Sequence, residues 1–193
     1  MSENDFEKIK TNLLAKLNKL SSYLTYHRVD HTLDVIKQSE RIANEEGITN
    51  ERDLFLLQVA SLYHDTGFLE TYAEHEIKSC GIFMEDAINL DFTDKEKEII
   101  RGLIMATKIP QQPNTLMEKI ICDADLDYLG RQDFFKIGDT LRKEFLHYKI
   151  VQNNDDWERL QVKFLQFHKY HTDTSQKNRE PVKQQHLSKL LVV

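Results

Sequence analysis

The stretch Ser61-Leu62-Tyr63-His64-Asp65-Thr66-Gly67-Phe68 decides how the chain is interpreted. An apolar helical pattern that starts at Leu54 ends there in His64 and Asp65. A helix held by packing alone ends on its apolar face and a simple cap, whereas this one ends on two side chains that are both metal ligands. Gly67 would let the chain turn away so that both side chains face one ion. We therefore searched the sequence for further ligands.

The composition predicts a helical protein. Six glycines and three prolines are few for 193 residues, and Leu, Ile, Lys, Glu and Gln are abundant, so we expect long uninterrupted helices. The length suits one domain with a substantial core. No alternating strand pattern of useful length and no internal repeat is present. The sequence predicts an all-α bundle of eight or nine helices, with residues 1–193 as a single domain.

Apolar residues at helical spacing locate these elements. Asn50 and Thr93 are expected to cap two of the helices, and Asn114 a third. The two prolines at 110 and 113 predict a loop. The expected helices cover about residues 3–20, 30–46, 51–65, 72–89, 94–104, 116–129, 133–153, 156–170 and 180–191.

The charge and the cysteines exclude several classes of function. A net charge of −6 gives no general attraction for nucleic acid or anionic lipid. No apolar run reaches the roughly 18 residues of a membrane helix, and the acidic first residues do not resemble a signal peptide. Cys80 and Cys122 lie within apolar patterns and are expected to be buried free thiols. We expect a cytoplasmic protein without nucleic-acid or membrane partners; the oligomeric state stays open, a homodimer included.

Two further places in the sequence offer ligands to join His64 and Asp65. His27 and His31 are four residues apart and would face the same way on a helix. Asp125 lies within an apolar helical turn, where a carboxylate needs a cation or a hydrogen-bond partner. Imidazoles and carboxylates together make a mixed nitrogen and oxygen site that suits a divalent ion such as Mn, Mg, Fe, Zn, Ni or Co.

His31, then the His64-Asp65 pair with Gly67, then Asp125, in a helical chain, resembles the HD-domain superfamily of metal-dependent phosphohydrolases. The first motif, from Tyr26-His27 to Asp34-Val35, is similar to that of the cyclic nucleotide phosphodiesterases, and the stretch that starts at Asp123 and ends at Gly130 is similar to that of a bacterial group of predicted HD phosphohydrolases. The resemblance covers about residues 23–145, which would form the metal core, with closing helices at about 155–191.

The resemblance implies roles for these residues. His31, His64, Asp65 and Asp125 would hold one metal ion, which would activate a water for attack at phosphorus. His27 matches the histidine that gives a proton to the leaving oxygen. Asp65 would take part in catalysis through the ion, and a second ion bridged by Asp65 stays open.

The sequence also departs from the phosphodiesterase pattern. Arg28 stands where that motif has Asn, and the region 104–108 lacks one of the histidines that bind a second ion in binuclear members, although His75 could match the other. Asp123 and Asp127 are expected to be a helix-cap group and a surface group. Further candidates for the substrate site, or for support of the ligands, are His75, Lys108, Arg131, Arg142, His171 and Arg179.

The sequence therefore predicts a metal-dependent phosphohydrolase that cleaves a phosphoester or phosphoanhydride in a small nucleotide-like molecule. One alternative is a sensor or regulatory domain that keeps the ligands and binds a nucleotide without hydrolysing it. Another is a helical interaction module that holds no ion.

Overall fold

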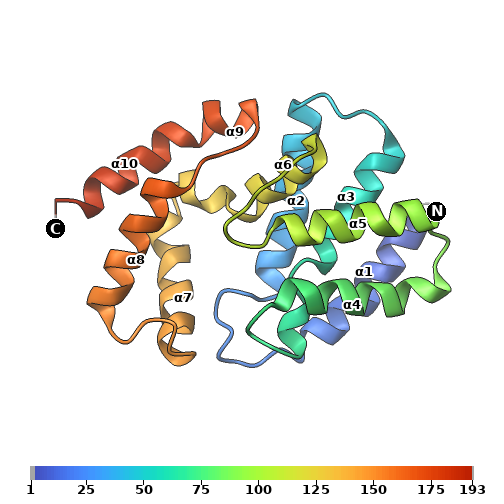
Figure 1. The fold of residues 1–193 in the computed structure, drawn as a ribbon, viewed down its shortest axis with the longest axis horizontal. Coiled ribbons are helices and arrows are strands. Elements are labelled where there is room, and N and C mark those ends of the chain that lie inside the picture. The colour runs from blue at the N-terminus through green and yellow to red at the C-terminus, as the bar shows by residue number, and fades with distance from the viewer. Residues whose placement is uncertain (1–2, 193) are drawn as a thin grey trace.

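The computed structural model describes residues 3–192, and within them the chain forms only helices and connecting loops (Figure 1). The all-α prediction is confirmed. Ten α-helices and three short 3₁₀ helices lie in this part of the chain. They are α1 (Glu3–Leu17), α2 (Val29–Glu45), α3 (Glu51–Tyr63), η1 (Thr66–Leu69), α4 (His75–Asp86), η2 (Ala87–Asn89), α5 (Asp94–Ala106), α6 (Leu116–Asp125), η3 (Asp127–Gly130), α7 (Phe134–His147), α8 (Asn154–Phe167), α9 (Asp173–Asn178) and α10 (Glu180–Leu190).

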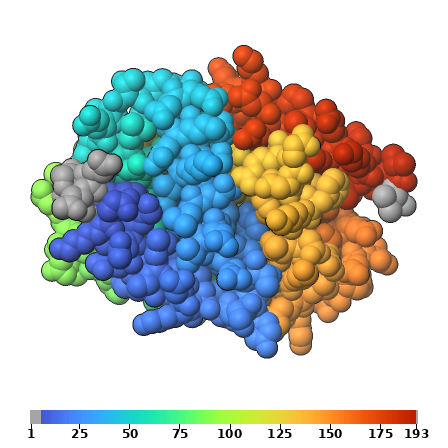
Figure 2. All heavy atoms as spheres, turned by 180° about the vertical axis from the view of Figure 1, so that it is seen from behind, coloured from blue at the N-terminus to red at the C-terminus, as the bar shows by residue number. Residues whose placement is uncertain are grey.

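The helices pack around two apolar cores. The larger core is built by α1 to α6 and includes Leu13, Ile42 and Phe83, which are all but inaccessible to solvent. The smaller core lies among η3, α7, α8 and α10 and includes Phe134 and Leu165. Seen from behind, α2 and the segment before it separate the helices of the larger core from the C-terminal helices (Figure 2). The predicted metal ligands come from the region where the two cores meet.

The starts of the helices follow the predicted capping chemistry with one exception. The Asn50 side chain accepts hydrogen bonds from the first turn of α3, and Thr93 and Glu96 form a reciprocal capping box on α5. The prediction that Asn114 caps α6 is wrong. Thr115 is the cap, because its hydroxyl accepts from the backbone of Glu118 and the Glu118 carboxylate binds back.

Several predicted helices are shorter in the structure, and one helix was not predicted. The helix expected over residues 116–129, for example, ends at Asp125 and is followed by the separate 3₁₀ helix η3. The helix expected from residue 72 starts at His75, because Glu74 before it has a left-handed backbone with φ of 53°. The helix expected to reach residue 153 ends at His147, and the one expected to reach 170 ends at Phe167. The short helix α9 lacks an apolar stripe, and periodicity did not reveal it.

The expectation that Asp123 and Asp127 are a helix-cap group and a surface group is wrong. Both carboxylates are fully buried. Asp123 accepts hydrogen bonds from the backbone N–H groups of His171 and Thr172 and from the Thr172 hydroxyl. Asp127 lies between the guanidinium groups of Arg41 and Arg179, at 2.7 and 2.8 Å. The turn after α6 is thereby tied to the C-terminal segment.

Two further observations bear on the predictions from composition. Cys80 and Cys122 are buried and free, as expected. In residues 3–192, none of the helices combines the length and the apolar character that crossing a membrane would require.

Candidate metal centre

Three of the four predicted ligands, His31, His64 and Asp65, come together between the two cores in a group that could hold a metal ion, and Asp125 lies beside the two histidines. His31 comes from the first turn of α2, His64 and Asp65 follow α3 directly, and Asp125 is the last residue of α6. The Nε2 atom of His64 lies 3.1 Å from Oδ2 of Asp65 and 3.4 Å from Nε2 of His31. Oδ1 of Asp125 lies 3.2 Å from Nε2 of His31 and 3.6 Å from Nε2 of His64. Two nitrogen and two oxygen atoms thus face one another.

Gly67 supports the His64-Asp65 pair by close packing and not by an unusual turn. A Cβ atom at this position would lie 1.9 Å from the backbone oxygen of His75. The Gly67 N–H donates to the Ser79 hydroxyl, which in turn donates to the backbone oxygen of His64. The expectation that Gly67 serves to turn the chain is therefore wrong: glycine is needed because η1 and α4 touch along their backbones.

The orientation of these side chains fits a divalent cation. The Nδ1 atom of His64 lies 2.8 Å from the Ser61 backbone oxygen, so this nitrogen carries a proton and Nε2 offers its lone pair to the centre. Oδ2 of Asp65 is buried and has no hydrogen-bond partner in the described part of the chain. A buried carboxylate oxygen without a donor needs a cation. Such a mixed donor set suits several divalent metals and does not select among them.

The pKa values of the metal-free centre also indicate that it favours positive charge. Burial lowers the pKa of His31, but the nearby carboxylates of Asp125 and Asp65 outweigh burial and raise the pKa to about 9. Burial acts against the charged form of Asp125 as well, yet the two histidines lower the pKa of this carboxyl to about 2. The two buried carboxylates are therefore stabilised by a nearby positive charge. Protons on the imidazoles supply this charge when no ion is bound.

His27 lies beside the centre, and a carboxylate that the sequence analysis missed holds it there. Its Nδ1 donates to Oε1 of Glu144 on α7, and its ring stacks on Phe68 with the ring centroids 4.2 Å apart. The fully buried Glu144 also accepts from the backbone N–H groups of Tyr26 and His27 and from the Tyr72 hydroxyl. Although burial opposes it, the hydrogen bond to His27 lowers the pKa of Glu144 and keeps it anionic.

His75 is the one other predicted residue that the structure brings to the centre. Its Nε2 lies 3.3 Å from Oδ1 of Asp65, the carboxylate oxygen that points away from His31 and His64, and 3.6 Å from Oε1 of the buried Glu76. The region 104–108, where a further histidine was sought, contributes the buried Thr107 to the same cavity.

The remaining candidates form ion pairs or hydrogen bonds with other groups, although Arg131 also lines a cavity that reaches Asp125. Lys108 pairs with Glu74 near the surface, and Arg142 binds Asp139 and Asn154. His171 and Arg179 bind the buried Asp123 and Asp127 through the contacts already described. Arg131 pairs with Asp34 and Asp133.

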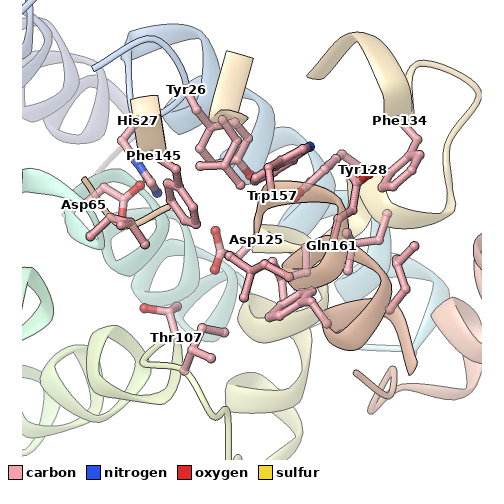
Figure 3. Close-up of a pocket in the computed structure, with 18 of the residues that line it drawn as sticks. Tyr26, His27, Asp65, Thr107, Asp125, Tyr128, Phe134, Phe145, Trp157 and Gln161 are labelled. Atoms are coloured by element: carbon pink, nitrogen blue, oxygen red, sulfur yellow. The ribbon is translucent and has the colours of Figure 1, made fainter. Parts of the chain in front are cut away.

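A cavity of about 340 Å³, which we call the apolar pocket, opens at the centre. His27, Asp65, His75 and Asp125 line its metal end, whereas aromatic and aliphatic side chains of η3, α7 and α8 line the rest. Figure 3 shows His27, Asp65 and Asp125 toward one end of this pocket and Phe134 and Gln161 toward the other. A second cavity of about 420 Å³, the polar depression, also reaches Asp125 and is lined by Arg28, Asp30, Asp34, Arg131 and Lys136, among others.

An all-helical fold that brings an adjacent His-Asp pair together with a distant His is compatible with metal binding. The family model for the HD domain matches residues 28–127, just over half of the 193-residue chain, and the chain belongs to this family. The four predicted ligands and His75 all lie within the matched range. HD domains bind divalent metals. No curated protein and no solved structure matches the chain.

Proposed function

We propose that this chain is a metal-dependent phosphohydrolase that cleaves a phosphoester or phosphoanhydride bond of a small organic molecule. The observation that carries the proposal is that one cavity contains the proposed metal ligands Asp65 and Asp125 at the same end as the ring of His27. A divalent ion held by His31, His64, Asp65 and Asp125 would supply Lewis acidity, which activates water and neutralises phosphate charge.

The residues of the chain account for the other requirements of the reaction. His27 faces the cavity while Glu144 binds its Nδ1, so Nε2 is the nitrogen that can give a proton to a leaving oxygen. The anionic Glu144 stabilises the protonated imidazole and fixes the plane of its ring. His75, beside the second oxygen of Asp65, can hold a water or a phosphate oxygen at the edge of the centre.

Metal analysis and kinetics of two variants test this proposal. We expect His64→Ala and Asp65→Ala to lose the bound divalent ion, measured by elemental analysis, and to lose phosphate release with Mn, Mg, Ni or Co. His147→Ala is the matched control, because His147 is exposed on α7. Full metal-dependent turnover in either His64→Ala or Asp65→Ala would refute the proposed site.

The same experiment separates the alternatives. Stoichiometric metal without turnover of any phosphate ester would favour the sensor or regulatory domain, which shares the ligands but not the role of His27. Protein that binds no ion at all would favour the helical interaction module.

A further inference from the structure

The apolar pocket differs in chemistry from a polyphosphate site. We propose that it binds the leaving group of the substrate and that this group is uncharged and largely apolar, so the enzyme acts on phosphate esters of hydrophobic alcohols in preference to diphosphates and nucleoside triphosphates. This inference rests on the proposed function, and it departs from the nucleotide-like substrate that the sequence predicts.

The position of His27 decides on which side of the metal centre the leaving group lies. A proton donor must reach the oxygen of the bond that breaks, at about 2.6–3.2 Å or through one water. His27 lines the apolar pocket, whereas it is not among the residues that line the polar depression. The alcohol that departs therefore occupies the apolar pocket, and the phosphoryl group lies between it and the metal ligands.

The walls of this pocket suit a hydrophobic group. Trp157 meets Phe145 edge to face, with ring centroids 5.8 Å apart, and Tyr128 stacks on Phe134 at 6.1 Å. Leu165 closes the wall from α8. The volume of about 340 Å³ lies in the range of small-molecule sites, about 300–1,000 Å³. Burial of a hydrocarbon group against such walls stabilises the complex because it removes apolar surface from water.

Charge argues against a second phosphate in the same place. Among the described residues that line the apolar pocket, none is Lys or Arg, while Asp65, Glu76 and Asp125 bring negative charge to its metal end. One metal-bound phosphoryl group can be neutralised by the ion, but each further phosphate would be desolvated without a cation. Gln161 is the amide side chain on the apolar walls, and it carries no charge.

The polar depression is also poorly suited to bind a polyphosphate. It contains Arg28, Arg131 and Lys136, but also Asp30 and Asp34. The guanidinium group of Arg131 is already bound by two carboxylates. Tyr26, Asp125 and Tyr128 line both cavities.

Binding can be tested without activity, because Trp157 is the only tryptophan in the sequence. Geraniol, an uncharged apolar alcohol, should change the fluorescence of Trp157 in the metal-free protein and saturate. Phe164→Ala, which removes a ring from the pocket wall, should raise the Kd about tenfold or more. Phe167→Ala is the matched control, because Phe167 lies on the same helix but is 73% exposed and should leave the Kd unchanged. No fluorescence change with geraniol, or equal effects of both variants, would overturn the proposal.

Kinetics with matched esters test the charge argument. We expect kcat/KM for geranyl phosphate to exceed that for ethyl phosphate by about 100-fold, because the longer chain fills the apolar pocket. Geranyl diphosphate should be a poorer substrate than geranyl phosphate. Gln161→Lys, which places a cation in the wall, should shift this preference toward the diphosphate by about tenfold. Preference of the unaltered protein for geranyl diphosphate, or for dATP over dAMP, would overturn the inference.

The two proposals fail in different ways. If geraniol binds but no phosphate ester is hydrolysed with any metal, the proposed function is refuted while the apolar ligand site is supported. If phosphate esters are hydrolysed but polyanions are preferred, the proposed function stands and the inference about the leaving group is wrong.

Discussion

Replacing Glu144 by glutamine should impair proton donation by His27 while the His27 ring stays in place. Glutamine keeps the size of the side chain and one oxygen, which can still accept from the backbone N–H groups of Tyr26 and His27. It removes the negative charge that faces Nδ1 of His27. A hydrogen bond to a charged group contributes about 1.5–3 kcal/mol, and loss of that stabilisation from a protonated donor corresponds to about a 10- to 150-fold lower rate.

The loss should depend on the leaving group, which a purely structural effect would not produce. Benzyl phosphate releases a basic alkoxide and needs the proton, so we expect the full decrease in kcat/KM for Glu144→Gln. p-Nitrophenyl phosphate releases a stable anion and should lose much less. Glu158→Gln, an exposed position on α8, is the matched control and should retain both activities. Equal losses on the two substrates, with an unchanged melting temperature, would refute the role of His27 as the proton donor.

Three further predictions concern stability, measured by urea unfolding followed by circular dichroism. Because its pKa is raised from 6.5 to about 9, His31 stabilises the metal-free fold fully below pH 6.5; about 3 kcal/mol should be lost as the pH rises through 9, and a flat profile would contradict this. Gly67→Ala should cost about 3 kcal/mol or more, since its Cβ would collide with the His75 backbone, whereas Gly81→Ala, with open space around it, should be neutral or stabilise by about 0.5–1 kcal/mol. Asp127→Asn should cost about 3–5 kcal/mol because it leaves two arginines without their buried carboxylate; a loss below 1 kcal/mol would show that these pairs contribute little.

Three of the four proposed ligands could be recognised in the sequence because they interrupt an apolar helical pattern. His64 and Asp65 end such a pattern, and Asp125 lies inside one, so burial could be inferred from the neighbouring residues. Charged groups in such positions need partners, and this requirement connects residues that are distant in the chain. The complete set of four, with His31, was predicted by the resemblance to the HD-domain superfamily and not by residue order and helical spacing alone.

Glu144 was missed although the sequence contains a signal for it. It follows Ile137 and Leu141 at helical spacing and is therefore on the apolar face of α7. A glutamate on such a face is as informative as Asp125 on α6. The partner of Glu144 could not be identified in this way, because Tyr26 and His27 lie more than a hundred residues earlier and only the packing of α7 brings them together.

The predictions about the arginines and about Asp127 depended on the way α9 and α10 return to the metal core. Arg179 could have pointed to the substrate or to a carboxylate, and periodicity does not distinguish the two. The structure pairs it with Asp127. The apolar pocket could not be predicted for a similar reason, since its walls come from three separate elements whose contacts are not local in sequence.

The buried carboxylates on either side of Asp125 have a consequence for the order in which the protein matures. Asp123 and Asp127 obtain their partners from His171, Thr172 and Arg179, which a ribosome adds some fifty residues later. Until that segment emerges, the turn that carries Asp125 contains carboxylates without most of their donors. Burial of this turn would then cost free energy, because the carboxylates would lose water without gaining partners. A nascent chain that stops before residue 171 would therefore contain all four proposed metal ligands and still lack the packing that holds them together.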